Sequence, residues 1–259
     1  MIPKTIHYCW FGGNDKPKLV KKCIQSWYKF CPGFRIIEWN DNNFDLSSAP
    51  LFVRQAASMK KWAFVTDYVR LRIIYEQGGV YLDTDVELLK PLDPFLSERA
   101  YFGFEFTNGI ATGLGFGAER KCEILKDLMA SYETTSFIQE DGLIDSTVCV
   151  KKDTAVFMGY GLILNNQEQI LDNGIHIYPS DYFCPGRWKG IMNVTDNTVS
   201  IHWYASTWYD EKGKRNAKKS RRKELKVHIM HFPNRLGIKI LGHKKYEQLK
   251  KVLKGKQDG

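Results

Sequence analysis

The stretch Gly78-Gly79-Val80-Tyr81-Leu82-Asp83-Thr84-Asp85 decides the fold of this chain. The two glycines end a predicted helix, a short apolar run predicts a buried strand, and two carboxylates follow one residue apart. Because side chains alternate along a strand, we expect Asp83 and Asp85 to point to the same side. Paired carboxylate oxygens suit Mg²⁺ or Mn²⁺, which bind substrate phosphates. An isolated Asp-x-Asp pair is more often an ordinary strand end, so its surroundings decide the interpretation.

A helix predicted over residues 60–77 leads directly into this stretch. Apolar residues recur along it at helical spacing: Phe64, Tyr68, Leu71 and Tyr75. Asp67 and Arg70 lie on another edge, where an i,i+3 surface ion pair would be worth about 0.2–0.5 kcal/mol. We favour a functional role, because a carboxylate can accept ribose hydroxyls and a guanidinium can bind phosphate.

The N-terminal part predicts the start of an α/β nucleotide-binding arrangement. A strand over residues 6–11, a helix over 18–30 and a strand over 34–39 follow one another. Trp10 lies at the carboxyl end of the first strand, where open α/β sheets bind ligands, and its indole could stack on a nucleobase. Core packing is the more ordinary role for His7.

The rest of the body is less regular. It predicts a strand over 101–106, a glycine-rich stretch over 109–117, a helix over 120–132 and a late strand over 199–203. The region between residues 135 and 177 predicts only short mixed elements. The pattern as a whole indicates an α/β class.

The net charge of +9 on the 259 residues is unevenly distributed. Residues 210–259 hold 17 Lys/Arg and 5 Asp/Glu, whereas residues 1–209 hold 21 and 24. We therefore expect a domain over 1–209 and a basic, amphipathic tail over 210–259. Such a run is usually a solvated face, but the apolar residues that follow it favour an anionic membrane surface. Nucleic acid is the competing partner, and no nucleic-acid-binding motif accompanies the charge.

The cysteines and the N-terminus indicate a compartment. Six scattered cysteines form no Cys-x-x-Cys pair, which argues against a structural zinc site. The first residues form a strand-like run without the features of a signal peptide, and no apolar segment reaches the roughly 20 residues that span a bilayer. We expect a reducing, cytoplasmic location, with peripheral binding to an inner membrane.

Three blocks of the chain, taken together, resemble glycosyltransferase family 32. They are Ile2-Pro3-Lys4-Thr5-Ile6-His7-Tyr8-Cys9-Trp10-Phe11-Gly12, Thr66-Asp67-Tyr68-Val69-Arg70 and the Gly78 to Asp85 stretch. The block from His202 to Trp208 completes the pattern in the family's order. The resemblance implies a GT-A fold, which is a Rossmann-like mixed central sheet flanked by helices, here followed by a basic helical appendage. It also implies a nucleotide-sugar donor, a divalent cation and retention of anomeric configuration.

The resemblance assigns the donor-binding residues upstream of the acidic pair. Trp10 would stack on the base. Asp67 and Arg70 would hold the ribose and the donor sugar.

The same resemblance assigns the cation site. Asp83 would contact sugar or ribose as well as metal, and Asp85 would be a metal ligand. His202 would complete the metal site. Ser206 and Trp208 would lie near the diphosphate, to which their hydroxyl and indole groups can donate hydrogen bonds.

The predicted function is metal-dependent, retaining transfer of a hexose, with a UDP-sugar favoured. The acceptor would be a glycan, which could be lipid-linked, in capsular or surface polysaccharide synthesis. Asp83, Asp85 and Arg70 are the catalytic candidates; Glu105, at a strand end, is a further candidate that is equally well an ordinary strand-end carboxylate. The alternatives are a nucleotide-sugar hydrolase, a toxin-like protein glycosyltransferase, and a non-catalytic module that binds nucleotide-sugars or nucleic acid.

Overall fold

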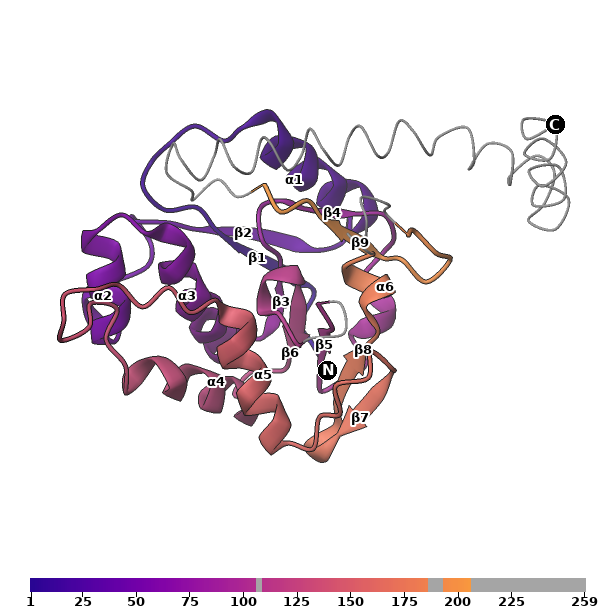
Figure 1. Ribbon diagram of the computed structural model, residues 1–259. Helices are drawn as coiled ribbons and strands as arrows, with labels where there is room; N and C mark the ends of the chain where they lie inside the picture. Colours follow the sequence, from indigo (N-terminus) through magenta and orange to yellow (C-terminus); the bar gives the residue numbers. More distant parts are fainter. Residues whose placement is uncertain (106–108, 186–192, 206–259) are drawn as a thin grey trace, which may run out of the picture. The chain divides into compact units, whose positions relative to one another are not determined.

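A mixed sheet is the centre of the computed structural model, which describes residues 1–105, 109–185 and 193–205. Its seven strands are β1 (Thr5–Cys9), β2 (Arg35–Trp39), β3 (Gly79–Tyr81), β5 (Ala100–Gly103), β6 (Phe116–Ala118), β7 (Gln169–Leu171) and β8 (Ile175–Tyr178). They lie in the order β2-β1-β3-β6-β5-β8-β7 (Figure 1). β1 runs parallel to β2 and β3, whereas β6 is antiparallel to β3 and β5. Two further strands, β4 (Val86–Leu88) and β9 (Ser200–His202), pair with each other in a separate antiparallel ribbon.

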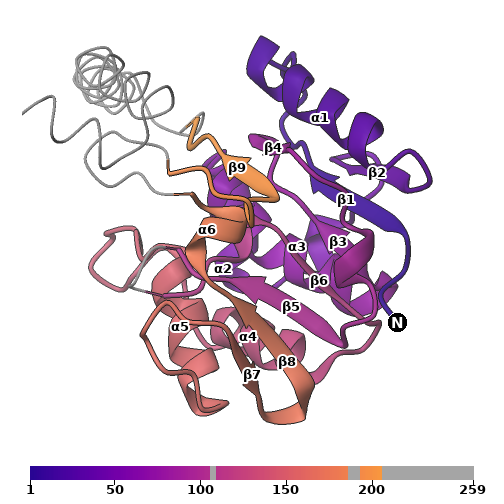
Figure 2. The same cartoon turned by 90° about the vertical axis from the view of Figure 1, so that its right-hand side faces the viewer.

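Helices cover both faces of the large sheet. They are α1 (Lys18–Phe30), α2 (Leu51–Ser58), α3 (Trp62–Gln77), α4 (Glu123–Glu133), α5 (Cys149–Gly159) and the short α6 (Ser180–Phe183). The helices α2 to α5 lie on one face, and α1 with the β4–β9 ribbon lies on the other (Figures 1 and 2). The α/β class with a mixed central sheet flanked by helices, expected from the sequence, is confirmed.

Alternation along the strands divides the apolar residues between two cores. Val80 and Leu82 pack into the core beneath α1, and Tyr81 between them packs into the core beneath α2 to α5. On β5, Tyr101 likewise packs into the core beneath α1, and Phe102 packs into the core beneath α2 to α5. This alternation follows from the two-residue period of a strand whose two faces are both covered.

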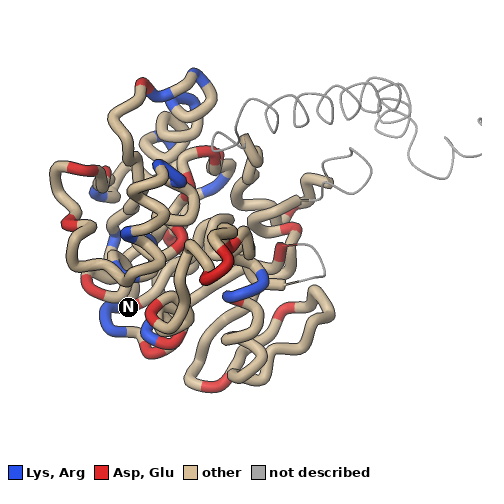
Figure 3. The backbone as a smooth tube through the Cα atoms, turned by 60° about the vertical axis from the view of Figure 1, so that its left-hand side comes forward, with Lys and Arg blue, Asp and Glu red and all other residues tan. Residues whose placement is uncertain are grey.

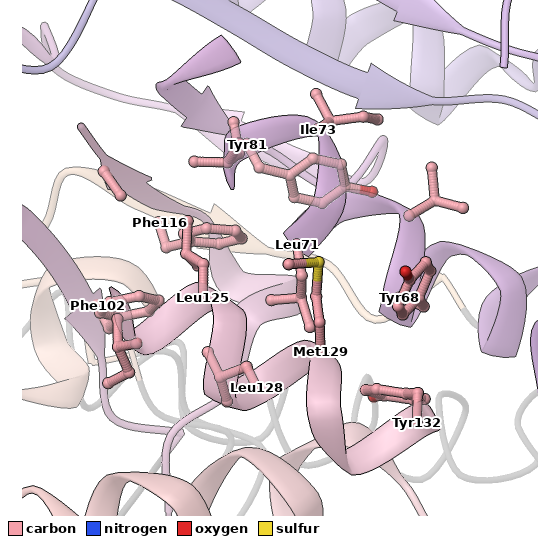
Figure 4. Close-up of a cluster of buried hydrophobic side chains, with 14 of the residues drawn as sticks. Tyr68, Leu71, Ile73, Tyr81, Phe102, Phe116, Leu125, Leu128, Met129 and Tyr132 are labelled. Atoms are coloured by element: carbon pink, nitrogen blue, oxygen red, sulfur yellow. The ribbon is translucent and has the colours of Figure 1, made fainter. Parts of the chain in front are cut away.

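The core beneath α3 and α4 is rich in aromatic rings (Figure 4). Phe102 and Phe116, on neighbouring strands, stack with their ring centroids 5.1 Å apart. Burying a side chain of this size stabilises the fold by about 1.5–3 kcal/mol. The helix α3 is buried on most of its sides, including Asp67, Arg70 and Ile74, so it lacks the single apolar face that the sequence suggests.

The glycine pair between α3 and β3 is required by the backbone. Gly78 and Gly79 have φ values of +66° and +106°, which residues with a side chain rarely adopt. A Cβ at Gly78 would lie 2.9 Å from the backbone nitrogen of Arg120, and one at Gly79 would lie 2.7 Å from the carbonyl oxygen of Thr5. The pair therefore lets the helix pass directly into the buried strand.

Several predicted elements agree closely with the structure. The helix predicted over residues 18–30 has those bounds, and the one over 60–77 begins at Trp62. The region of mixed elements, 135–177, contains α5, β7 and most of β8. The predicted division at residue 209 and the basic tail lie outside the described residues.

Acidic and basic residues are interspersed along the described chain (Figure 3). This agrees with the near-balanced counts of residues 1–209, which hold 21 Lys/Arg and 24 Asp/Glu. No helix within the described ranges is both long enough and apolar enough to cross a membrane. All six cysteines are free thiols.

His7 is a core residue, as its sequence context favours. It is 1% exposed, and the indole N–H of Trp39 donates to its Nδ1 at 3.0 Å. Because an indole nitrogen can only donate, the proton of the neutral ring is on Nε2, which donates to the carbonyl of Gly78 at 3.1 Å. Burial lowers the pKa of His7 to about 4.

We expect this histidine to make the protein sensitive to acid. Its pKa is below the unfolded value of about 6.5, so the unfolded chain takes up the proton first and stability falls between pH 6.5 and 4. At pH 5 the loss should be about 2 kcal/mol relative to pH 7. In the variant His7→Gln, whose amide can both accept and donate, this component should disappear. Urea unfolding at pH 7 and pH 5 measures the difference, and equal losses in both proteins would contradict the assignment.

Candidate functional site

The predicted site residues gather at the carboxyl ends of two parallel strands. β1 and β3 are paired neighbours, with Ile6 opposite Val80. Trp10 follows the end of β1, and the acidic pair follows the end of β3. This edge of an open α/β sheet is where ligands bind, because the loops after parallel strands meet there.

The two carboxylates come together through a turn and not through strand alternation. β3 ends at Tyr81, and the amide of Val86 donates to the carbonyl of Asp83 at 2.9 Å, which closes a turn across Asp83, Thr84 and Asp85. The strand-based reason for their common direction is therefore wrong. Their convergence depends on the turn and on the strand that follows it.

The ribbon of β4 and β9 brings His202 to the acidic pair. His202 lies opposite Val86, the residue after Asp85. Its Nε2 is 3.0 Å from Asp85 Oδ1 and 4.0 Å from Asp83 Oδ2. Further bonds from the same segment hold Asp85: the Trp203 amide donates to its carbonyl at 3.0 Å, and the Ala205 amide donates to its Oδ2 at 2.6 Å.

The three side chains fit a hard divalent cation. One ligand atom from each of Asp83, Asp85 and His202 lies within 4.8 Å of the others. Ligands held about 2.1 Å from an octahedral cation lie between about 3.0 Å and about 4.2 Å apart. The distances from His202 Nε2 to the two carboxylates, 3.0 and 4.0 Å, lie within this range. Two carboxylates and an imidazole are a donor set that Mn²⁺ or Mg²⁺ accepts, with positions left for phosphate oxygens.

Electrostatics within this group support a cation. Burial raises the pKa of Asp83, although the nearby Arg70 opposes the shift. Burial also disfavours ionised Asp85, but the facing His202 and the Ala205 amide outweigh it and hold the pKa of Asp85 below its usual range. Desolvation disfavours protonated His202, and the two carboxylates more than offset it, so the pKa of His202 is raised. The two carboxylates thus favour a positive charge at this position.

Arg70 forms the other side of the site and is almost fully buried. It is 3% exposed, its Nη2 donates to Asp67 Oδ1 at 2.6 Å, and its Nε donates to the carbonyl of Thr66 at 3.0 Å. Nη2 also lies 3.7 Å from Asp83 Oδ1. The pair with Asp67 is therefore a buried interaction and not the weak surface pair that its spacing alone would suggest.

One nitrogen of this guanidinium is left to bind a ligand. Arg70 Nη1 is buried and has no hydrogen-bond partner among the described residues. A buried N–H without a partner costs about 1–3 kcal/mol, so an oxygen of a bound molecule would be stabilising there. Asp67, beside it, has a pKa that burial raises to about 6 against the opposing effect of Arg70.

A glycine that the sequence analysis did not single out lies against both sides of the site. A Cβ at Gly113 would lie 2.7 Å from Asp83 Oδ2 and 2.9 Å from Arg70 Nη1. The neighbouring Thr112 is fully buried and donates through both its N–H and its hydroxyl to Asp153. The glycine-rich stretch over 109–117 was the feature of the sequence that pointed to this part of the site. Nothing in the sequence around Asp153, in the middle of a helix, indicated its contact with Thr112.

Trp10 and the late donors complete the predicted set. Trp10 is half-buried, its indole N–H donates to the carbonyl of Asn14 at 2.6 Å, and Lys16 Nζ lies 5.7 Å from its ring centroid. Its stacking role stays a prediction. Ser206 and Trp208 lie outside the described residues.

A hydrogen bond from Tyr204 holds Glu105 near the group formed by Asp83, Asp85 and His202. Glu105 lies two residues beyond the end of β5, and the hydroxyl of Tyr204 donates to its Oε1 at 2.6 Å. The ring of Tyr204 lies 4.1 Å, between centroids, from that of His202, and the charge of Glu105 contributes to the raised pKa of His202. The carboxylate is thus placed beside the site; a catalytic role for it stays a prediction.

Comparison with known families agrees with this geometry. Residues 17–102 match the model of the family described as "Glycosyltransferase sugar-binding region containing DXD motif". The matched part contains the buried pair on α3 and the acidic turn after β3. The predicted resemblance to glycosyltransferase family 32 is confirmed over this part of the chain, which is similar to a DXD-containing glycosyltransferase region.

Curated relatives cover part of the chain. It is 33% identical over 122 residues to "Inositol phosphoceramide mannosyltransferase 3" of Schizosaccharomyces pombe, a match that covers 44% of this chain and 33% of that protein. It is 32% identical over 105 residues to "Initiation-specific alpha-1,6-mannosyltransferase" of Candida albicans, covering 37% of this chain and 27% of that protein. The chain therefore spans about a third or less of the length of these two relatives.

Solved structures with some similarity are also glycosyltransferases. "PaToxG Glycosyltransferase" aligns with a TM-score of 0.49 at 15% identity, covering 61% of this chain and 69% of that one. A glycosyltransferase "involved in the glycosylation of the major capsid of PBCV-1" aligns with a TM-score of 0.43 at 11% identity, covering 86% and 98%.

The cation site makes a direct prediction. Mn²⁺ should raise the melting temperature of the wild type, because a ligand at 100 times its dissociation constant adds about 2.7 kcal/mol to stability. Asp85→Asn and His202→Gln should each remove most of this shift. Asp93→Asn, which changes an exposed carboxylate paired with Lys4, should keep it. Calorimetry with and without Mn²⁺ measures the effect, and an equal shift in all four proteins would refute the site.

Proposed function

We propose that this chain is a retaining, divalent-metal-dependent hexosyltransferase that moves a hexose from a nucleotide-sugar to a glycan acceptor. The observation that supports this most is the position of Asp83. Its carboxylate lies between the imidazole of His202 at 4.0 Å and the buried guanidinium of Arg70 at 3.7 Å. The proposed cation ligands thus lie next to a guanidinium that has an unpaired N–H. A sugar diphosphate could use both, with its phosphates on the cation and an oxygen on the N–H.

The donor would lie along the carboxyl edge of the sheet. Trp10, after β1, would stack on the base. Asp67 and Arg70 would hold the ribose and the sugar, with Arg70 Nη1 as the free donor. Asp83 and Asp85 would face the diphosphate together with the cation.

The chemistry follows from charge development on the leaving group. A bound Mg²⁺ or Mn²⁺ would offset the negative charge on the departing diphosphate. The acceptor hydroxyl oxygen bonds to the anomeric carbon on the face from which the diphosphate leaves, the bond from that carbon to the phosphate oxygen breaks, and this oxygen takes the hydroxyl proton. Arg70 stabilises the developing charge through its fixed N–H groups. Glu105, held by Tyr204, would contact the sugar.

The nucleotide, the sugar and the acceptor rest on three separate arguments. The sequence favours a UDP-sugar. The curated relatives are named as mannosyltransferases, which favours mannose as the hexose. One relative is named for inositol phosphoceramide, a lipid, and this supports a lipid-linked acceptor. Surface or capsular glycan synthesis is proposed from the sequence alone.

Donor turnover tests the proposal. A panel of UDP- and GDP-sugars with Mn²⁺ should reveal one donor that releases its nucleoside diphosphate. EDTA and Asp85→Ala should each abolish release. Arg70→Lys should lower kcat/KM by about 100-fold, because a lysine keeps the charge and loses the planar set of N–H donors.

Arg72→Lys is the matched control for the guanidinium. Arg72 lies on the same helix, but it bonds Glu76 and Ser48 near the surface, so its turnover should equal that of the wild type. Release that persists in EDTA would contradict the metal dependence. Absence of both turnover and nucleotide binding would contradict the proposed function.

We also propose that residues 210–259, with 17 Lys/Arg and 5 Asp/Glu, bring the enzyme to an anionic membrane surface. Vesicles that contain about 30% anionic lipid should sediment the full chain at low salt and lose it at high salt, because screening weakens such contacts. A chain without residues 210–259 should remain in the supernatant. Equal sedimentation of both chains would contradict the proposal.

A further inference from the structure

Asp153, on α5, is a buried carboxylate outside the residues assigned above. It is 1% exposed, and its Oδ2 accepts the Thr112 N–H at 3.1 Å and the Thr112 hydroxyl at 2.9 Å. A buried carboxylate is costly unless it is hydrogen-bonded. Here both of these bonds go to one residue of a segment without regular strand pairing, so the carboxylate holds that segment in place.

The next residue of α5 holds the same segment. Thr154 Oγ1 accepts the N–H of Ile110 at 3.0 Å and donates to the carbonyl of Val150 at 2.6 Å. Two adjacent side chains of α5 thus bind backbone amides two residues apart. A Cβ at Gly109 would lie 2.2 Å from Thr154 Oγ1, so a glycine is needed for this close approach. We call residues 109–114 the anchored segment.

The other side of the anchored segment faces the proposed donor site. Gly113 follows Thr112, and a Cβ there would meet Asp83 Oδ2 at 2.7 Å and Arg70 Nη1 at 2.9 Å. Neither side chain can easily move away. Arg70 is bonded to Asp67 and Thr66, and the hydroxyl of Tyr81 donates to Asp83 Oδ1 at 2.9 Å. The anchored segment is therefore fixed between α5 and the two groups that would touch the donor sugar.

We propose that Asp153 is a positioning residue for the donor sugar. By holding both donors of Thr112, it fixes the backbone of Gly113 against Asp83 and Arg70, and this backbone forms one wall of the sugar pocket. This inference rests on the proposed function. It assigns Asp153 to recognition of the sugar and not of the nucleotide, because Asp153 holds only the backbone wall. Asp83 and Arg70, which would also face the diphosphate and the ribose, are held by Tyr81 and by Asp67 and Thr66.

A conservative replacement separates this role from general packing. Burial raises the pKa of Asp153 to about 7, against the opposing effect of the two bonds from Thr112, so its negative charge is weakly held at neutral pH. An asparagine supplies the same acceptor oxygen without charge. Asp153→Asn should therefore keep the wall in place, whereas Asp153→Ala leaves both donors of Thr112 without a partner.

The experiment compares two ligands in the full chain. With Mn²⁺ present, calorimetry measures the affinity for the nucleotide-sugar and for its nucleoside diphosphate. Asp153→Ala should weaken nucleotide-sugar binding, and lower kcat/KM for donor turnover, by about tenfold, while nucleoside diphosphate binding stays within about twofold. Asp153→Asn should restore both values to within about threefold of the wild type.

A matched control accounts for lost stability. Gln55, on α2, also holds a loop through one side-chain oxygen, which accepts the amides of Phe137 and Ile138 at 2.9 and 3.1 Å. Gln55→Ala should lower the melting temperature without changing either affinity. If Asp153→Ala does not fold, Thr112→Val removes only the hydroxyl bond and should weaken sugar binding in the same direction by about threefold.

The outcomes separate this inference from the proposed function. A wild type that binds neither ligand overturns the proposed function and the positioning role with it. A wild type that binds both, with equal losses for the two ligands in Asp153→Ala, shows a purely structural residue and overturns the positioning role alone. Unchanged binding in Asp153→Ala, or failure of Asp153→Asn to restore it, also overturns that role.

Discussion

The buried guanidinium of Arg70 is the constraint on which the site depends. A charge that is 3% exposed must be compensated, and the compensation comes from Asp67 on the same helix and from Asp83 beyond the adjoining strand. The ring of Tyr81, 5.3 Å from the guanidinium carbon, adds a further contact. These interactions fix α3 relative to the turn after β3. Any folded state that keeps the guanidinium of Arg70 buried and paired therefore also keeps the residues of the site in place.

Charge balance links the two halves of the site. Asp83 is shared between Arg70 on one side and His202 on the other, at 3.7 and 4.0 Å. Asp85 and Asp83 favour a positive charge at His202 and raise the pKa of its imidazole. A divalent cation held by the proposed ligands would need the neutral imidazole, so its binding should weaken as the pH falls. A diphosphate would then meet positive charge that is already in place.

The sequence predicts what depends on local pattern and leaves out what depends on long-range pairing. The helix over 18–30 and the glycine pair follow from periodicity and backbone conformation, which are properties of consecutive residues. The resemblance named Asp83, Asp85 and His202, but spacing along the chain could not show that a turn and a second strand bring them together.

The buried role of Asp153 was equally beyond sequence reasoning. A single carboxylate in a helix is usually solvated, and its partner Thr112 lies 41 residues away. The same holds for Gly113, whose contact with Asp83 and Arg70 depends on how the segment between β5 and β6 lies on α5. Only tertiary packing shows what Asp153 and Gly113 contact, because local propensity and composition do not encode contacts between distant segments.

The ribbon of β4 and β9 has a consequence for how the protein is made. Asp85 receives its bond from Ala205, which is 120 residues further along the chain. On the ribosome, the strands β1 to β6 and the acidic turn emerge long before the strand that carries His202. A nascent chain therefore carries the two carboxylates without the imidazole, and the complete set of proposed ligands exists only after β9 has been synthesised and paired. Acquisition of the proposed cation would thus be a late event in the life of each molecule, coupled to a contact between residues 120 positions apart.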